Sequence, residues 1–320
     1  MKPPGTLSRR RFLGLAASAL AAAVPWPARA LEPRRTRLKA CLSPGSIGVQ
    51  ADQDRAIALA AQFGFDAVEP FPRHLAGLEA GALTALLDRL QRANLVWGAA
   101  GLPVEFRRDD AAFRSSLEAL PALAAGLQRA GVTRVGTWLS PASNTLTYPQ
   151  NFRRHAERLR AVAQILADHG LRLGLEYVGT FTSRAGARFP FVHNLPETRE
   201  LIAEIGTGNV GVILDSWHWW QAEDTEADLL ALRAEDVVSV DLNDAPAGRA
   251  KHEQLDGQRE LPAATGVIDL APFLRALDRI GYDGPVRAEP FNAALNALDD
   301  EAACAATIAA LRKALNRPAV

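Results

Sequence analysis

The sequence has 320 residues, of which 48% are hydrophobic and 22% are charged, with 36 basic and 36 acidic residues. This composition excludes a disordered chain, and the length allows one large domain with a substantial core. Residues 1–30 hold five of the basic residues and no acidic residue, so the remainder has 31 basic against 36 acidic residues, a net charge of about −5. A net negative charge argues against nucleic acid as a partner.

The first 30 residues have the order of an export signal. The stretch "SRRRFLGLAASALAAAV" places Arg9 and Arg10 before an apolar run over 12–24, and "ARA" follows at 28–30. This order is typical of a secretory signal, and Ser-Arg-Arg-x-Phe-Leu resembles the twin-arginine signal that exports folded proteins. A membrane anchor is the less favoured alternative, because the apolar run is shorter than the roughly 20 residues needed to span a bilayer. We therefore expect a periplasmic protein with no stable membrane span after cleavage.

Residues 31–320 alternate between short β-rich runs and longer segments of helical period. Helical patterns such as 53–64, 113–131 and 152–170 separate the β-rich runs, and glycine ends several of them before the next strand. We predict eight strands, at 39–43, 66–71, 95–100, 134–138, 171–178, 209–215, 237–244 and 285–291.

Eight β-α units without a linker predict a single-domain α/β fold, a closed (β/α)8 TIM barrel. An open doubly wound sheet is less favoured, since "CLSPGSIGV" after the first strand is not a Gly-rich phosphate loop. The two cysteines, Cys41 and Cys304, fall in the first strand and the last helix. A disulfide between them remains open, but cysteines in apolar surroundings are more often free.

Four consecutive strands each place a carboxylate near the carboxyl end, where the active sites of TIM barrels lie. Period-two alternation puts the apolar residues of these strands outward, against the helices. The residues left facing inward include Glu176, Asp215, Asp241 and Glu289. Because neighbouring strands lie about 4.8 Å apart, the four carboxylates can point at one place.

Four unpaired carboxylates would repel one another, and a bound divalent cation is the simplest way to offset that repulsion. We therefore predict a metal site made of these four residues. All-oxygen ligation favours Mn²⁺ or Mg²⁺, with Co²⁺ as a third candidate. The alternative is that lysine or arginine side chains neutralise the carboxylates.

The motifs "GLEYVG", "VILDSWHWW", "VVSVDLNDAPAG", "RELPAATGVIDL" and "GYDGPVRAEPF" resemble the xylose isomerase-like TIM-barrel superfamily, which includes ketose 3-epimerases and inosose dehydratases. The resemblance covers nearly all of residues 31–320 and implies the same four metal ligands. Asp241 departs from it, because relatives usually have histidine there. An aspartate can still ligate Mn²⁺ or Mg²⁺, and a weakened or inactive site is the alternative.

The resemblance implies a metal-dependent sugar isomerase, epimerase or dehydratase that works through an enediolate. Glu176 and Glu289 are then both metal ligands and the catalytic acid and base. Export argues for an unphosphorylated sugar, keto-sugar or cyclitol as the substrate. The expected substrate-binding residues are His218 and Arg259 from the family-like motifs, and Glu69, Trp138, Trp217 and His252 from strand ends and loops.

Two other functions remain as alternatives. One is a catalytically inactive sugar-binding or accessory protein on the same barrel, which the departure at Asp241 keeps open. The other is an apurinic-site endonuclease, which is less favoured because its zinc cluster needs many histidines and His155 and His169 fall within predicted helices. The sequence does not decide whether the chain forms a homo-oligomer.

Overall fold

The computed structural model describes residue 1 and residues 38–316, so the predicted export signal lies outside the described residues. Within the described part, strands and helices alternate along the chain, as the sequence predicts. The main sheet contains β1 (Lys39–Leu42), β2 (Ala67–Val68), β3 (Val96–Trp97), β4 (Ala100–Gly101), β5 (Arg134–Trp138), β7 (Arg172–Glu176), β9 (Val210–Asp215), β10 (Val237–Leu242) and β11 (Pro285–Ala288).

The sheet curls into a barrel of parallel strands in the order β3-β2-β1-β11-β10-β9-β7-β5-β4. The third predicted strand, 95–100, is interrupted at Gly98 and Ala99. Its first half, β3, pairs with β2, and its second half, β4, pairs with β5. One interrupted strand therefore joins the two ends of the sheet, and the predicted TIM barrel is confirmed.

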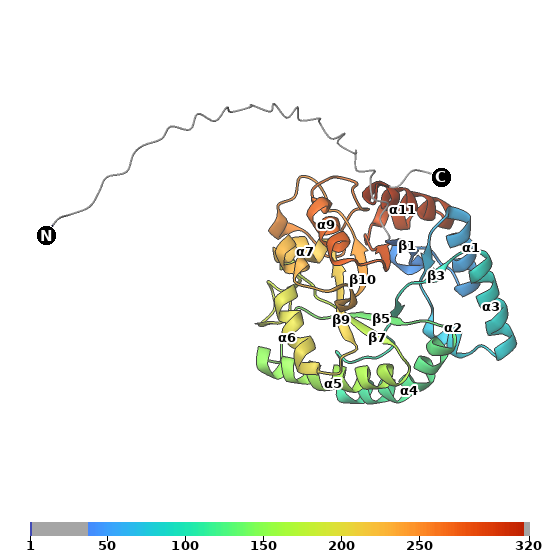
Figure 1. Ribbon diagram of the computed structural model, residues 1–320, viewed down its shortest axis with the longest axis horizontal. Helices are drawn as coiled ribbons and strands as arrows, with labels where there is room; N and C mark the ends of the chain where they lie inside the picture. The colour runs from blue at the N-terminus through green and yellow to red at the C-terminus, as the bar shows by residue number, and fades with distance from the viewer. Residues whose placement is uncertain (2–37, 317–320) are drawn as a thin grey trace, which may run out of the picture. The chain divides into compact units, whose positions relative to one another are not determined.

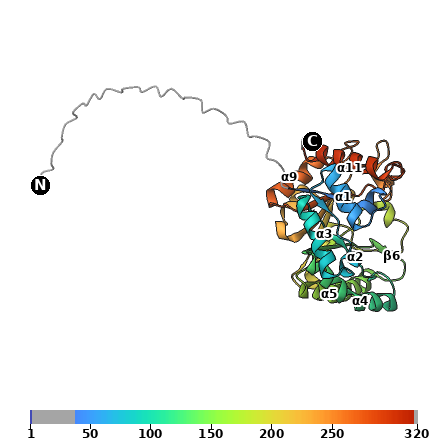
Figure 2. The same cartoon turned by 90° about the vertical axis from the view of Figure 1, so that its right-hand side faces the viewer.

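Helices surround the strands on the outside of the barrel (Figure 1). The longer ones are α1 (Gln53–Phe63), α3 (Ala80–Arg92), α4 (Asp110–Arg129), α5 (Tyr148–Asp168), α6 (Leu195–Ile205), α9 (Leu270–Ile280) and α11 (Asp300–Ala314). Asp52, Asp109 and Asp299 cap the amino ends of α1, α4 and α11 by accepting backbone hydrogen bonds. The last helix, α11, lies beside α1 in both Figure 1 and Figure 2, which closes the outer ring.

Shorter helical segments occupy the loops between these elements. They are η1 (Pro44–Ile47), α2 (Pro72–Ala76), η2 (Phe181–Ser183), α7 (Ser216–Ala222), α8 (Glu226–Leu230), η3 (Ala234–Asp236), η4 (Lys251–Glu253) and α10 (Ala293–Asn296). A small antiparallel pair, β6 (Ala142–Ser143) and β8 (Phe189–Pro190), joins two loops. Among the described residues, no helix is both long and apolar enough to cross a membrane. Cys41 and Cys304 are buried and free, as favoured from their surroundings.

The barrel interior is filled by an isoleucine packed against glycines. A Cβ atom on Gly136 of β5 would lie 2.6 Å from Cδ1 of Ile213, and one on Gly174 of β7 would lie 2.8 Å from its Cγ1. Only glycine allows this close approach, because real Cβ atoms do not come so near. Ile213 and Gly136 also line the cavity above them, so this packing forms the floor of the candidate site.

Candidate active site

The structure gathers the four predicted carboxylates at the carboxyl ends of four neighbouring strands. Glu176 ends β7, Asp215 ends β9, Asp241 lies in β10, and Glu289 directly follows β11. Asp241 is the register partner of Asp215 on the adjacent strand. One carboxylate oxygen from each residue lies within 4.8 Å of the others. The inward orientation expected from period-two alternation brings all four side chains together.

Arg287 binds two of these carboxylates, although the sequence analysis did not predict it as a site residue. Its Nε and Nη2 atoms donate to the two carboxylate oxygens of Asp241 at 2.7 and 2.9 Å, a bidentate pair. Nη2 also donates to Oε1 of Glu289 at 3.1 Å. Arg287 lies in β11, two residues before Glu289, so alternation turns both side chains toward the barrel interior. The same alternation could have identified it from the sequence.

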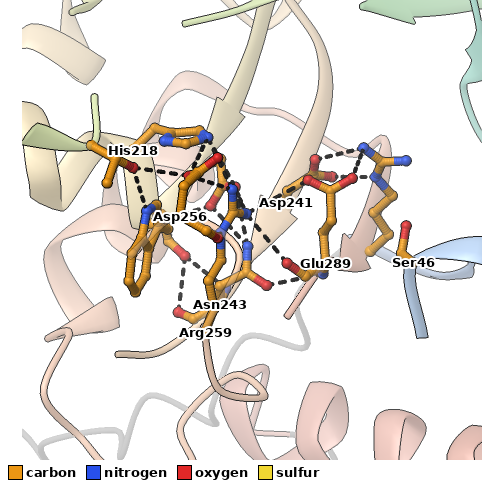
Figure 3. A network of polar contacts seen from close by, with 12 residues as sticks. Ser46, His218, Asp241, Asn243, Asp256, Arg259 and Glu289 are labelled. Atoms are coloured by element: carbon orange, nitrogen blue, oxygen red, sulfur yellow. Dashed lines mark hydrogen bonds and ion pairs between the residues drawn. The ribbon is translucent and has the colours of Figure 1, made fainter. Parts of the chain in front are cut away.

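Arg259 neutralises the other side of the cluster. Its Nη1 donates to Oδ2 of Asp215 at 2.8 Å and lies 3.6 Å from Oε2 of Glu289, while Nη2 donates to Asp256 at 2.9 Å. The Arg259 side chain is 1% exposed, so these pairs are screened little by water. Figure 3 shows Asp241, Asn243, Asp256 and Glu289 linked with Arg259 in one polar network. Arginine side chains therefore neutralise part of the carboxylate cluster, which is the alternative to a metal that the sequence left open.

Asp215 has hydrogen bonds on both carboxylate oxygens. The amide of Asn243 donates to Oδ1 at 3.0 Å and to Oδ2 at 3.1 Å, and the backbone N–H of Trp217 donates to Oδ1 at 2.7 Å. This last bond makes Asp215 the amino-terminal cap of α7. Burial raises the pKa of Asp215 to about 7, although Arg259 acts in the opposite direction. Asn243 also accepts from the backbone N–H of Glu289 and so holds two strand ends together.

Glu176 differs from the other three carboxylates because one of its oxygens has no partner. Its Oε1 is buried and makes no hydrogen bond to any residue of 38–316. Burial, with the charges of Glu289, Asp241 and Asp215, raises the pKa of Glu176 well above its ordinary value. A buried carboxylate oxygen with no donor, beside three further carboxylates, fits a hard divalent cation. Glu176 with Asp215 and His218 forms a second set with the spacing of metal ligands.

His218 lies on α7, within reach of the same cluster. Its Nε2 is 3.2 Å from Nη2 of Arg259 and 3.9 Å from Oδ2 of Asp215. Burial lowers the pKa of His218 to about 3, and the neighbouring Arg259 acts in the same direction. The imidazole is therefore neutral at physiological pH and is available as a hydrogen-bonding group or a ligand.

A cavity of about 680 Å³ opens above the carboxylates. Of the expected substrate-binding residues, His218, Arg259 and Trp138 line it, together with Glu176 and Glu289. Lining residues that were not predicted from the sequence include Arg107, Asp256, Arg287 and Phe291. Arg107 and Asp256 lie in loops, where no periodic pattern indicates which side chains point inward. Arg287 and Phe291 fall within the strand predicted over 285–291, and the alternation that turned Glu289 inward applies to both.

Three expected substrate-binding residues are not among those lining this cavity. Trp217 is fully buried, and its indole N–H donates to the hydroxyl of Thr180 at 2.8 Å. Glu69 is bound by the hydroxyl of Ser43, and burial raises its pKa. His252 is exposed on η4. None of the three is among the residues at the surface of this cavity, and their role in substrate binding stays a prediction.

The chain is similar to a family of barrels along most of its length. The family model described as a xylose isomerase-like TIM barrel matches residues 57–314. A solved xylose isomerase domain protein from Alicyclobacillus acidocaldarius subsp. acidocaldarius is 33% identical, over 87% of this chain and 98% of that chain, with a TM-score of 0.76. The solved IolI protein with a zinc atom is 19% identical over 87% and 98% of the two chains, with a TM-score of 0.72, and shares the fold.

Two curated enzymes match a smaller part of the chain. A 3-dehydroshikimate dehydratase from Pseudomonas aeruginosa is 29% identical over 139 residues, which are 43% of this chain and 20% of the relative. A ketose 3-epimerase from Arthrobacter globiformis is 28% identical over 138 residues, 43% of this chain and 41% of the relative. The match thus covers less than half the length of either enzyme.

Proposed function

The chain belongs to the xylose isomerase-like TIM barrel family, and on that premise we propose that it is a metal-dependent sugar isomerase, epimerase or dehydratase. The observation that carries the proposal is the unpartnered oxygen of Glu176, buried among three other carboxylates at the floor of a cavity. The similarity to a ketose 3-epimerase and to a 3-dehydroshikimate dehydratase supports the reaction class. The substrate we propose is an unphosphorylated sugar, keto-sugar or cyclitol.

The two glutamates are proposed to handle the proton. Glu176 and Glu289 project from strands that are not adjacent, since β9 and β10 lie between them, so they approach a substrate from different sides. One glutamate, as the carboxylate, takes the proton beside the carbonyl, and the other, in its protonated form, gives its own proton to the same or the neighbouring carbon. The contacts of Glu289 with Arg287 and Arg259 hold it in place. A bound divalent cation would supply stabilisation of the negative charge that develops on the substrate oxygens.

The residues proposed to hold the cation are Glu176, Asp215, Asp241 and Glu289. Their oxygens favour Mn²⁺ or Mg²⁺, and Co²⁺ is the third candidate. The zinc atom of the similar IolI protein is a further reason to test several metals.

We expect protein purified without chelator to contain about one equivalent of a divalent metal, because four clustered carboxylates exceed the two arginines that face them. Mass spectrometry of metal content measures this, and the same protein after dialysis against EDTA is the control. Less than about a tenth of an equivalent of every divalent metal would contradict the proposed metal dependence.

Proton exchange tests the proposed reaction directly. Protein loaded with Mn²⁺ is incubated in D₂O with a panel of unphosphorylated keto-sugars, keto-sugar acids and inososes, and NMR follows deuterium beside the carbonyl. We expect one panel member to exchange in the parent protein, because a reaction through an enediolate begins by removing that proton. Exchange equal to that of a protein-free sample for every compound would argue against this chemistry.

A non-catalytic sugar-binding protein is the second candidate. The bidentate pair between Arg287 and Asp241 favours it, since Asp241 is already neutralised by the chain itself. A binding protein would retain affinity for a sugar and show no exchange with any panel member, so the same experiment combined with calorimetry separates the two functions.

We also propose export to the periplasm through the twin-arginine pathway, with removal of residues 1–30. The support is the sequence "SRRRFLGLAASALAAAV" followed by "ARA". Cell fractionation of the parent chain and of a variant with Arg9→Lys and Arg10→Lys tests it. The parent protein in the cytoplasmic fraction alone would contradict this location.

A further inference from the structure

Arg107 is a guanidinium group held at the wall of the cavity, in the segment between β4 and α4. Its Nη1 donates to the hydroxyl of Thr137 at 3.0 Å and to the backbone carbonyl of Trp138 at 2.6 Å. The guanidinium carbon lies 4.5 Å from the ring centre of Phe106 and 4.2 Å from that of Trp138. Two aromatic rings and two hydrogen bonds thus fix this charge in place.

The charge of Arg107 is not compensated by a nearby carboxylate. Within residues 38–316, Arg107 makes no ion pair, whereas Arg259 and Arg287, which line the same cavity, each contact at least two carboxylates. Burial lowers the pKa of Arg107, and Glu105 only opposes this from a distance beyond ion-pair range. A fixed, partly buried cation without a counterion is costly unless a ligand supplies the negative charge.

The donors that Arg107 leaves free have the geometry of a carboxylate clamp. In the described part of the chain, only Nη1 of Arg107 donates to protein, which leaves Nε and Nη2 for a ligand. Arg287 uses the same pair of atoms, Nε and Nη2, to donate hydrogen bonds to both carboxylate oxygens of Asp241. A planar monoanion such as a carboxylate matches this pair of parallel donors.

Arg107 also lies close to the proposed reaction centre. It donates to the carbonyl of Trp138, and Trp138 is the register partner of Glu176 on the neighbouring strand. Adjacent strands are about 4.8 Å apart, so an anion bound at Arg107 would be within the length of one sugar of Glu176. The cavity of about 680 Å³ has room for a molecule that reaches both.

We propose that Arg107 binds the carboxylate of the substrate, and that the substrate is a sugar acid or a carboxylated cyclitol. The assignment of the substrate rests on the proposed function, but the binding of a sugar acid at Arg107 does not depend on any reaction. Asp215, Asp241 and Glu289 do not repel such a ligand strongly, because Arg259 and Arg287 already pair with them.

Calorimetry with the full chain tests the site, using three probes: D-glucuronate, D-galacturonate and D-glucose. We expect a uronate to bind at least about 10-fold more tightly than glucose, since a charged bidentate contact is gained. Arg107→Met should reduce this preference about 10- to 100-fold, and Arg107→Lys should restore part of it. The control is Arg108→Met, because Arg108 is the next residue and is exposed.

The outcomes separate this proposal from the proposed function. If neither uronate binds more tightly than glucose, or if Arg107→Met weakens uronate and glucose equally, the carboxylate site is wrong, whatever the exchange experiment shows. Circular dichroism and thermal unfolding of both Arg107 variants show whether either has lost its fold. If Arg107→Met is unfolded, the uronate preference of Arg107→Lys tests the proposal instead. Tighter Arg107-dependent binding of glucose 6-phosphate than of either uronate would also overturn the assignment, because it would identify a phosphate site.

Discussion

Glu176→Gln is expected to lower turnover by a factor on the order of 10² to 10⁴, the contribution typical of a positioned acid or base. Glutamine keeps the size of the side chain but cannot accept a proton or supply a charged metal ligand. The same change should not harm the fold, because the lost oxygen makes no hydrogen bond in the structure. Glu176 therefore carries function at the expense of stability.

The stability of metal-free protein provides a second readout of this variant. Burial and neighbouring carboxylates raise the pKa of Glu176 well above the ordinary value of 4.5, so the folded protein binds this proton more tightly than the unfolded chain. The contribution of Glu176 to stability is then lost as the pH rises above about 4.5. We expect the stabilising effect of Glu176→Gln in EDTA to grow with pH, up to about 2 kcal/mol.

Exchange in D₂O and urea unfolding at several pH values measure the two effects. Glu157→Gln is the matched control, because Glu157 is exposed on α5, outside the cavity. Full activity in the Glu176 variant would remove this residue from the proposed mechanism. A large loss of stability would show that its carboxylate has a partner that the structure lacks.

Arg259→Met is expected to cost about 3–5 kcal/mol of unfolding free energy, the penalty for breaking a buried ion pair from one side. The guanidinium is 1% exposed and lies 2.8 Å from Asp215 and 2.9 Å from Asp256. Its loss leaves these carboxylates without the cation that compensates their burial. At about 2–4 °C per kcal/mol for a domain of this size, the melting temperature should fall by roughly 10 °C.

A surface pair of similar chemistry provides the control for this prediction. Arg275 contacts both oxygens of Glu226 at 2.8 and 2.6 Å, but its side chain is 47% exposed. Arg275→Met should therefore cost no more than about 1 kcal/mol. If thermal and urea unfolding find equal losses for the two variants, burial of the Arg259 network does not contribute as argued.

The fold followed from patterns that are local in the chain. Alternation of strands and helices predicted a barrel, and each of the eight predicted strands overlaps a strand of the observed sheet. The strand predicted over 66–71 is only Ala67–Val68, because the chain after it turns toward α2. The interruption at Gly98 and Ala99 was not predicted, because it serves to close the ring between β2 and β5.

The candidate site was predicted less completely than the fold. The period-two alternation of strand side chains correctly predicted that four carboxylates point toward one place, namely those of Glu176, Asp215, Asp241 and Glu289. The same rule applied to Arg287 would have suggested that Asp241 has a partner on the next strand. By contrast, the orientation of Trp217 depends on packing against Thr180 and could not be derived from its position in "VILDSWHWW".

The sequence by itself determined the barrel and the inward direction of the four carboxylates, because both depend on spacing between residues that are neighbours in the chain. Only the tertiary structure decided which charges are neutralised. Arg287 and Asp241 are 46 residues apart, and Arg259 and Asp215 are 44 apart. An ion pair depends on distance in space, which closure of the barrel sets and local spacing does not. For the same reason the sequence did not identify Arg107, since its place in the cavity without an ion pair to residues 38–316 depends on the folded barrel.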